Sequence, residues 1–417
     1  MKHLTLFTFF LLLGYSSLSQ VYIDGGQTRH RFAQLTIGLT QRYLPANGTR
    51  TFEYQQVNLN NVPMTWSTES KLQIGGLHFW GHADFYVAID LIGIQSGNSI
   101  FRTDTETGFK YYPWRMERKK IRPYLGFSIN PTYFQSGSGI EKRVVLFPGQ
   151  TGLSYQFHNQ LLELGINYTY RNDIDYYYSR ADQRTAIVSP LWFTASYKFI
   201  IDTTIGAEKT WKNGQSEAYA QQLHEDHRLS GISVAVGPSS TWYVAESKHN
   251  AELHPHMDQP KTDGVFLDLG IGYFFHEPNI QINLAYRPLK TRLTGHGVDQ
   301  LIKRKALSLE ALKFLGDYHG FVPFIGPAIS WENLAIDETD FQINASSAGS
   351  FQGFKPGLSF GWDIRPTNHE EWLLRTNLRY FPNLDVNMDS GQTFSLDQIE
   401  FNFIQLVWYP ERTFGGK

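Results

Sequence analysis

Residues 264–289, GVFLDLGIGYFFHEPNIQINLAYRPL, contain two runs of strict alternation separated by a four-residue break. In the second run Ile280, Ile282 and Leu284 alternate with Gln281 and Asn283. In the first run, apolar residues alternate with glycines and an aspartate. A period of two residues belongs to a β-strand that separates an apolar from a polar environment. The stretch therefore predicts a β-hairpin.

The same alternation recurs along the whole chain. In residues 161–171 and 357–365, leucine, isoleucine and aromatic side chains occupy one face, and small or charged side chains occupy the other. Many of these faces end in Tyr, Trp or Phe, and 15% of all residues are aromatic. Segments of roughly ten residues with alternating hydrophobicity and aromatic ends are the sequence pattern of a transmembrane β-barrel.

The breaks between these segments alternate in length. Those near 81–83 and 276–278 are tight, whereas those near 244–263, 292–303 and 334–354 are long and polar. Short periplasmic turns and long extracellular loops are typical of bacterial outer-membrane barrels. We therefore predict an all-β fold, a single antiparallel transmembrane barrel of about 16 strands.

One connection, residues 203–230, is long where this register requires a periplasmic turn. It includes the sequence SEAYAQQLHEDHRL, whose composition favours a short helix. Either the segment is a periplasmic excursion, or two strands are miscounted and the barrel has 14.

The first residues, MKHLTLFTFFLLLGYSSLSQ, have one lysine, an apolar stretch from Leu4 to Leu13, and small polar residues up to Ser19. The apolar stretch is much shorter than the roughly 20 residues of a membrane-spanning helix. It is typical of a secretory signal peptide. We expect residues 1–19 to be cleaved and residues 20–417 to form the barrel.

Composition excludes several classes of function. The chain has no cysteine, so thiolate chemistry and cysteine-ligated metal sites are excluded. Its formal net charge of −2 argues against nucleic acid as a partner. It has no phosphate-binding loop, dinucleotide fingerprint or HExxH motif in a suitable context, and no cofactor is expected.

Two histidine groups are the best metal-ligand candidates. One is His224 with His227, and the other is His254, His256 and Asp258, with His249 nearby. Histidine and carboxylate at such spacings can bind zinc or another borderline cation. The predicted register places the two groups on opposite sides of the membrane, so they cannot combine. We favour solvated loops for both and expect no metal site.

An enzyme is not expected. Ser154 and His158 share one face of a predicted strand, but four residues of extended chain separate them by about 13 Å at roughly 3.3 Å per residue. A nucleophile and its base must lie within hydrogen-bond reach, so this pair does not form a catalytic site.

Three segments carry a resemblance to a known class of protein. They are residues 75–91 (GGLHFWGHADFYVAIDL), 306–331 (ALSLEALKFLGDYHGFVPFIGPAISW) and 401–410 (FNFIQLVWYP). Together with the signal peptide, they resemble outer-membrane β-barrel proteins of Gram-negative bacteria, porin-like barrels of the kind common in Bacteroidota. The resemblance implies a location in the cell outer membrane. It also implies contact with outer-membrane lipid and delivery by the outer-membrane assembly machinery, which would recognise the aromatic C-terminal strand.

The polar faces of the strands between residues 279 and 381 predict the residues that line the barrel interior. These candidates are Asn283, Arg287, Glu310, Glu332, Asp363, Arg375 and Arg379. Opposite charges on neighbouring strands can brace the wall by pairing, or can form a narrow passage of mixed charge. We favour bracing, because a selective pore usually carries a ring of one sign.

Two functions are carried forward from these observations. The first is a channel for small hydrophilic solutes, since a barrel of about 16 strands leaves an aqueous interior. The alternative is a structural or assembly component whose barrel is filled and whose loops bind other envelope proteins. An outer-membrane hydrolase is the least favoured.

Overall fold

The computed structural model describes two main stretches of the chain, residues 34–202 and 214–414, together with residues 22–24 and 27–28. Within the main stretches, residues 55–56, 64–65, 79–80, 96–98, 104, 115, 117–118, 137–139, 258, 261–265, 317–320 and 366–369 are left out. The predicted signal peptide, residues 1–19, lies outside the described residues.

The long strands form two separate antiparallel rings rather than one. The C-terminal barrel is closed by β17 (Gly231–Tyr243), β18 (Phe266–Phe275), β19 (Ile280–Gly295), β20 (Val298–Phe314), β21 (Phe321–Asp340), β22 (Ala345–Ile364), β23 (Trp372–Phe381) and β26 (Gln398–Trp408). Its strands follow one another in chain order, and β17 pairs with β26 to complete the ring. The hairpin predicted from residues 264–289 is β18 with β19.

The N-terminal barrel is built in the same way. Its ring contains β3 (Gln34–Leu44), β6 (Ser67–His78), β7 (Ala83–Gln95), β9 (Glu106–Tyr111), β10 (Ile121–Ser136), β12 (Gly149–Phe157), β13 (Gln160–Tyr168) and β16 (Leu191–Asp202). β9 pairs with both β7 and β10, and β16 pairs with β3, so the path of pairings returns to its start.

Shorter elements extend or connect the rings. β8 (Ser99–Thr103) and β11 (Ile140–Leu146) pair with the second half of β10, and β4 (Thr49–Tyr54), β5 (Val57–Pro63), β14 (Asp173–Ser179) and β15 (Asp182–Ile187) form a small sheet. β1 (Tyr22–Asp24) pairs with β2 (Gln27–Thr28), and β24 (Asp385–Asn387) pairs with β25 (Thr393–Ser395). The helices in the described residues are α3 (Gly214–Glu225), α4 (Lys248–Leu253) and α5 (Pro410–Phe414). None of the helices in the described residues is both long and apolar enough to cross a bilayer.

The single 16-stranded barrel, and its 14-stranded alternative, are therefore wrong, because each half of the chain closes on itself. The segment 203–230 joins the two rings and contains the predicted helix as α3. The alternation in the sequence predicts where the strands lie and which face of each is polar, and short turns predict which strands are neighbours. Closure of a ring depends on pairings between residues far apart in sequence. β16 and β17 are neighbours in the chain, yet β16 pairs with β3 and β17 with β26.

An apolar belt surrounds the outside of the C-terminal barrel. On β20 the outward side chains Leu307, Leu309 and Ala311 lie between Lys305 and Lys313. Leu307 and Leu309 are exposed, and so are leucine, isoleucine and aromatic side chains at matching positions of the neighbouring strands. A band of outward apolar residues about one transmembrane strand tall, with lysines at its edges, suits the hydrocarbon core of a bilayer.

The strands extend well past this belt at one end, called here the outer end. Two regions that we predicted as long loops are continuous strands joined by tight turns, at residues 296–297 between β19 and β20 and at residues 341–344 between β21 and β22. The prediction failed there because outward positions such as Lys303 and Asp337 become polar, while the inward alternation of Ile302, Leu334 and Ile336 continues. Outside the belt, a strand needs no apolar outer face.

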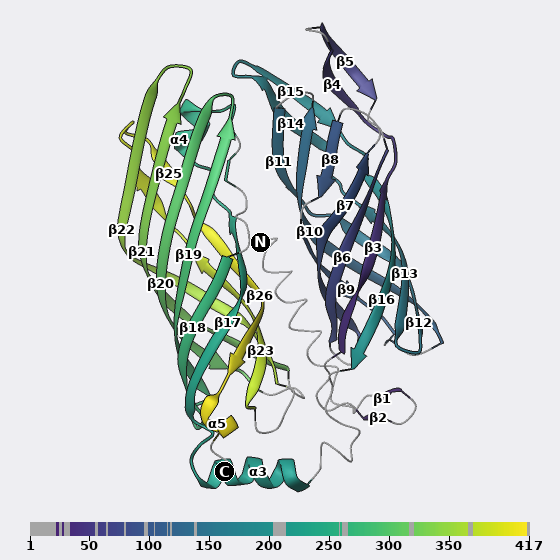
Figure 1. The fold of residues 1–417 in the computed structure, drawn as a ribbon, viewed down its shortest axis with the longest axis vertical. Helices are drawn as coiled ribbons and strands as arrows, with labels where there is room; N and C mark the ends of the chain where they lie inside the picture. The colour runs from purple at the N-terminus through teal and green to yellow at the C-terminus, as the bar shows by residue number, and fades with distance from the viewer. Residues whose placement is uncertain are drawn as a thin grey trace, which may run out of the picture.

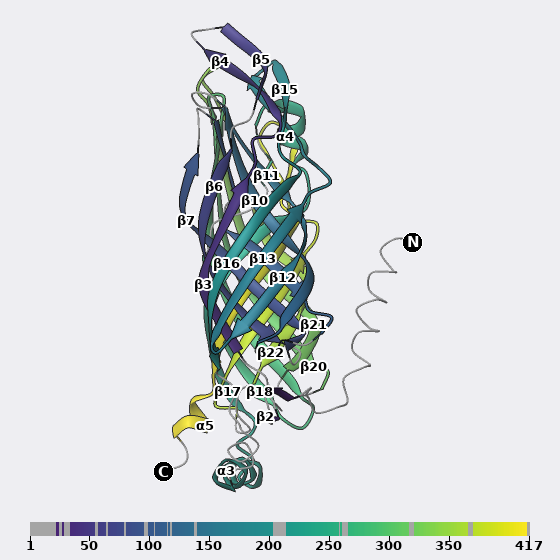
Figure 2. The ribbon, with the colours of Figure 1, turned by 90° about the vertical axis from the view of Figure 1, so that its right-hand side faces the viewer.

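The two barrels stand side by side with their long axes in similar directions (Figures 1 and 2). At the outer end, Arg180 in the β14–β15 turn donates to both carboxylate oxygens of Asp340, each at 2.7 Å, and to the carbonyl oxygen of His296 at 2.9 Å. Within the belt, the rings of Phe85 and Trp362 lie 5.3 Å apart. These contacts join β-turns and strand faces of one ring to those of the other.

Candidate functional site

All seven side chains predicted to line the barrel interior lie inside the C-terminal barrel. Each is at most 1% exposed. They point inward from β19, β20, β21, β22 and β23, as the alternation predicts. Partners reach them from strands across the ring as well as from neighbouring strands, so the interior is a connected set of charged and polar groups.

The first charged layer lies toward the inner end, where α5 follows β26. Nε and Nη2 of Arg375 donate to the two carboxylate oxygens of Asp363 at 2.7 and 2.9 Å. Nη2 also donates to Oε1 of Gln281 at 2.7 Å. This two-point geometry uses the planar fork of the guanidinium, which matches a carboxylate.

The second layer is centred on Arg379. Its Nη1 donates to Oδ2 of Asp268 at 2.6 Å, and its Nε donates to Oε1 of Glu310. Asn283 donates to the other oxygen of Glu310 at 3.2 Å, and Asn402 donates to Asp268 at 3.2 Å. Arg379 therefore links β18 with β20 across the interior from β23.

The third layer lies nearer the outer end. Nε and Nη2 of Arg304 each donate to Glu332 at 2.6 Å, and Nη1 donates to Glu400. Arg287 also donates to Glu400, which therefore bridges two arginines from the opposite side of the ring. The alternation places Asp268 on the polar face of its strand, but Asp268, Arg304 and Glu400 were not among the interior candidates. The interior was predicted only between residues 279 and 381, and Arg304 adjoined a predicted loop. The alternation with Glu310 on β20 could have found Arg304.

Apolar side chains close the interior at both ends. At the inner end the cluster is Ala235, Phe274, Leu312, Phe314, Val322, Phe324, Leu373, Val407 and Tyr409. At the outer end it is Tyr243, Ile302, Leu334, Ile336, Leu384, Val386, Met388, Phe394 and Leu396. The charged layers lie between these clusters. The interior is thus filled with side chains, as expected for a ring of eight strands.

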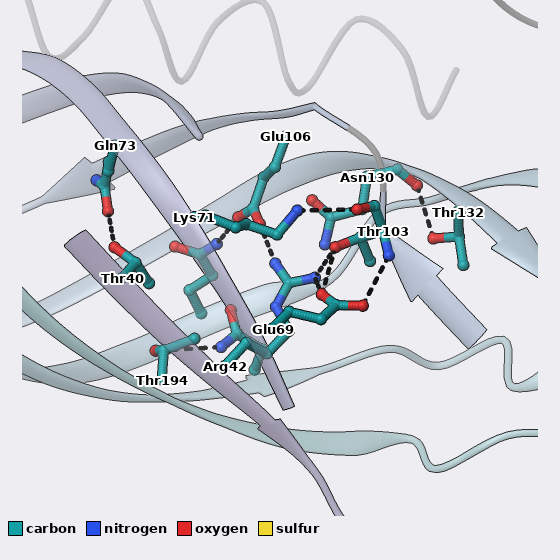
Figure 3. Close-up of polar contacts among 12 residues, drawn as sticks. Thr40, Arg42, Glu69, Lys71, Gln73, Thr103, Glu106, Asn130, Thr132 and Thr194 are labelled. Carbon is teal, nitrogen blue, oxygen red and sulfur yellow. Dashed lines mark hydrogen bonds and ion pairs between the residues drawn. The ribbon is translucent and has the colours of Figure 1, made fainter. Parts of the chain in front are cut away.

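The N-terminal barrel has its own charged interior, which we did not predict (Figure 3). Arg42 on β3 pairs with Glu106 on β9 and lies 3.5 Å from Glu69 on β6. Lys71 donates to the carbonyl oxygen of Thr103 at 3.0 Å. All of these side chains are buried.

A second group of buried charged side chains lies in the same ring. Nζ of Lys198 contacts Glu163 at 2.8 Å and Asp84 at 3.1 Å, and Lys110 pairs with the same oxygen of Glu163 at 2.5 Å. Tyr112 donates to the other oxygen of Glu163 at 2.8 Å. Glu163 is a charged residue on the polar face of the alternating segment 161–171, and closure of this half brings the two lysines to it.

At the outer end of the C-terminal barrel, where Figure 1 shows α4, His249 on this helix contacts Glu338 on β21. Nε2 of His249 lies 2.7 Å from Oε2 of Glu338, and Nε2 of His254 lies 2.9 Å from Oε1 of the same carboxylate. These three residues, called here the His–Glu cluster, are all buried. Their candidate ligand atoms lie within 4.8 Å of one another.

Local sequence explains why α4 forms and where it ends. The side chain of Ser247 accepts a hydrogen bond from the backbone N–H of Asn250, which caps the helix start. Asn250 is buried and exchanges hydrogen bonds with Gln300 on β20, at 3.1 and 2.7 Å. The chain then turns so that His254 returns toward the same wall. The helix is thus fixed to the wall of the ring at Asn250, directly after His249.

The prediction that the outer histidines are solvated is wrong for His249 and His254, which the loop folds into the barrel mouth. His256 is half-buried beside them, and burial together with Arg180, His254 and His296 lowers its pKa to about 4. Asp258 lies outside the described residues. His224 lies at the inner end, where its ring is 5.9 Å from that of His276. As predicted, the two histidine groups do not meet.

The other candidate chemistry does not assemble. Ser154 is buried and donates to the carbonyl oxygen of Arg122 at 3.0 Å. His158 is an exposed turn residue with a φ of 50°. The two side chains therefore have different surroundings.

Comparisons with known proteins give little beyond the fold. No family model matches the chain, and no curated protein matches it. Solved structures with a likeness include the Neisserial surface protein A, at 11% identity and a TM-score of 0.28, over 43% of this chain and 97% of that one. Ail, the attachment invasion locus protein of Yersinia pestis, has 11% identity and a TM-score of 0.27, over 43% and 96%.

A third solved structure is an outer membrane channel from Pseudomonas putida F1. It has 8% identity and a TM-score of 0.19, over 92% of this chain and 97% of that one. By their descriptions the first of these is a surface protein and the third is an outer membrane channel. At these scores the likenesses carry no argument about what this chain does.

Proposed function

We propose that this protein is an integral outer-membrane protein made of two filled β-barrels, and that it binds other envelope proteins at its outer end. The single observation that carries the proposal is the layered interior of the C-terminal barrel, where Arg304, Arg375 and Arg379 are buried and each is paired with a carboxylate. A channel needs a water-filled path, and these side chains occupy the place where it would run.

Residence in the outer membrane is supported by the apolar belt and by closure of both rings. In a bilayer every backbone N–H and C=O must find a partner within the protein, and closed barrels meet this requirement. Lipid is therefore the first partner proposed. Delivery by the outer-membrane assembly machinery, which the resemblance implies, belongs to the same proposal, as does the absence of enzymatic activity.

Partner binding at the outer end is supported by the turn between β21 and β22. Phe341 and Ile343 in this turn are 65% and 68% exposed, although the turn lies far beyond the apolar belt. Two large apolar side chains at an exposed tip are a frequent mark of a protein contact. The bidentate contact of Arg180 with Asp340 holds the base of this turn.

Channel formation, the second candidate, is tested by reconstituting the full-length protein in planar bilayers. The proposal expects no discrete conductance steps in either polarity. Stable steps that are retained after repeated purification would overturn it in favour of a solute channel. A 16-stranded porin measured in parallel shows that the bilayers report open channels.

Partner binding is tested by changing the tip. Phe341→Ser with Ile343→Ser should abolish co-purification of envelope proteins from membranes, whereas Gln342→Ser in the same turn should leave it intact. Equal recovery of the same proteins with both variants would show that the tip is not the binding site. The heat-dependent mobility of each folded variant on gels checks that the barrels are intact.

A further inference from the structure

We propose that His249, His254 and Glu338 bind a divalent transition metal ion of the zinc class, and that this ion fixes α4 in the mouth of the C-terminal barrel. The three residues come from two segments, the α4 loop and the outer end of β21, which are more than 80 residues apart in sequence. The proposal is independent of whether the outer end also binds a protein partner.

The arrangement is close to that of a bound ion. Zinc holds histidine nitrogen and carboxylate oxygen at about 2.0–2.2 Å, which places neighbouring ligand atoms roughly 3.3–3.5 Å apart in a tetrahedron. Here the nitrogen-to-oxygen distances are 2.7 and 2.9 Å, and all three ligand atoms lie within 4.8 Å. Small rotations of the two imidazoles are enough to admit an ion at their centre.

The surrounding groups are those that support metal ligands. Nδ1 of His249 lies 3.0 Å from Oγ of Ser390, so its second nitrogen is held while Nε2 faces the site. Nε2 of Gln300 donates to Oε2 of Glu338 at 2.6 Å and also to Asn250. Metal-binding histidines and carboxylates usually have such second partners, which orient them.

The donor set also indicates the kind of ion. Two imidazole nitrogens and one carboxylate oxygen suit zinc and its borderline neighbours, whereas calcium and magnesium prefer oxygen ligands alone. Three protein ligands leave a fourth position for water or for a group from outside. Each imidazole binds the ion through an unprotonated Nε2, so a neutral ring must carry its single proton on Nδ1, and a doubly protonated ring must release one proton to solvent.

The competing explanation is a latch of hydrogen bonds alone, in which both imidazoles donate to one carboxylate. The two explanations differ in their response to metal. A hydrogen-bonded latch is complete without an ion and gains nothing from one, whereas a metal site gains stability in proportion to occupancy because the ion binds only the folded arrangement.

The test uses the full-length protein, folded in detergent and stripped with a chelator, with zinc or cobalt(II) chloride as the only probe. We expect one zinc ion per chain after gel filtration, a higher thermal midpoint, and cobalt(II) absorption bands typical of a four-coordinate site. Glu338→Gln and His254→Ala should each weaken binding by at least about 100-fold, and Ser390→Ala by about 10–100-fold.

The matched control is His224→Ala with His227→Ala, which removes the other histidine pair at the inner end and should leave binding unchanged. If Glu338→Gln does not fold, the His254→Ala and Ser390→Ala variants still decide the question. The proposal is overturned if the wild-type protein retains no zinc, or if its binding is lost with the inner pair and kept with the outer variants.

Discussion

The two barrels differ in the cations that pair with their buried carboxylates. In the C-terminal barrel all four interior cations of the charged layers, Arg287, Arg304, Arg375 and Arg379, are arginines. Among the described residues of the N-terminal barrel, three lysines, Lys71, Lys110 and Lys198, and one arginine, Arg42, pair with carboxylates in the interior. Rings with the same number of strands can therefore be filled in two ways.

The difference has a physical meaning. A guanidinium presents donors in a fixed plane, so Arg304 and Arg375 each hold a carboxylate at two points and still reach another residue. An ammonium is a compact charge, so Lys198 sits between Asp84 and Glu163 without fixing the orientation of either. We expect the C-terminal interior to be the more rigid of the two.

The largest expected effect comes from removing one interior cation in each ring. Arg379→Leu leaves Asp268 and Glu310 buried without their arginine. Lys198→Leu leaves Asp84 buried without its lysine, while Glu163 keeps Lys110. Each change should lower the free energy of unfolding by about 3–5 kcal/mol, because an uncompensated buried charge remains. Chemical unfolding in detergent measures the free energy of unfolding of each variant. Hydrogen exchange with peptide-level mass spectrometry shows which strands lose protection.

These variants also show whether the rings are independent. Arg379→Leu should raise exchange in β17 to β26 and leave β3 to β16 protected, and Lys198→Leu should do the reverse. Loss of protection in both halves from either change would contradict the description of two separately closed rings.

The second prediction concerns the outer faces, where the two barrels should behave alike. Leu284 and Leu164 are both exposed on the apolar side of their strands. An arginine at either position meets lipid and should cost about 2–4 kcal/mol if the position lies near the bilayer midplane. The yield of heat-resistant folded protein after refolding into lipid vesicles measures the effect. Glutamine at the same positions is the milder control, and equal yields for arginine and wild type would show that the belt is misplaced.

Sequence reasoning succeeded where the relevant neighbours are close in the chain. The alternation around Asn283 and Arg287 assigned the inward face correctly. A shift of one residue would turn every side chain to the other face, so the pattern allows a single assignment. It failed for closure, since nothing near Asp202 or Gly231 reveals that the strands there pair with β3 and β26. The length of the connection between them was the available signal, and we interpreted it as an excursion.

In the His–Glu cluster, too, the local sequence revealed some of the residues and long-range pairing was needed for the rest. His249 and His254 were recognised as metal-ligand candidates from their spacing, but Glu338 was assigned to a loop. Its partners are 84 and 89 residues away, and the pairing of β20 with β21 places it beside Gln300. Burial of the histidines depends on α4 folding into the ring, which no local pattern encodes.

A smaller effect is expected where the two barrels touch. Arg180 is 25% exposed in its side chain and Asp340 is 4% exposed, so solvent screens the pair in part. A double-mutant cycle of Arg180→Ala and Asp340→Asn should give a coupling of about 0.5–1 kcal/mol, lower in 1 M salt. A coupling near zero at low salt would mean that this ion pair does not help to hold the rings together.

The smallest effect is the pH dependence at the inner end. Burial lowers the pKa of His276, with contributions of either sign from Glu370, Glu277, Arg412 and His224. Because the folded pKa lies below the unfolded value of about 6.5, stability is fully present above that pH and falls as the pH drops below it. His276→Gln should reduce the loss between pH 8 and pH 5. An unchanged loss would assign the pH dependence to other groups.

An even number of strands in each ring has a consequence for the chain as a whole. Each barrel is entered and left at the inner end, by Gln34 and Asp202 in one and by Gly231 and Trp408 in the other. The polypeptide between them therefore begins and ends on the same side of the membrane. Each half is a complete module in its connectivity, so the gene could be cut between them, and the halves exchanged in order, without any strand changing direction.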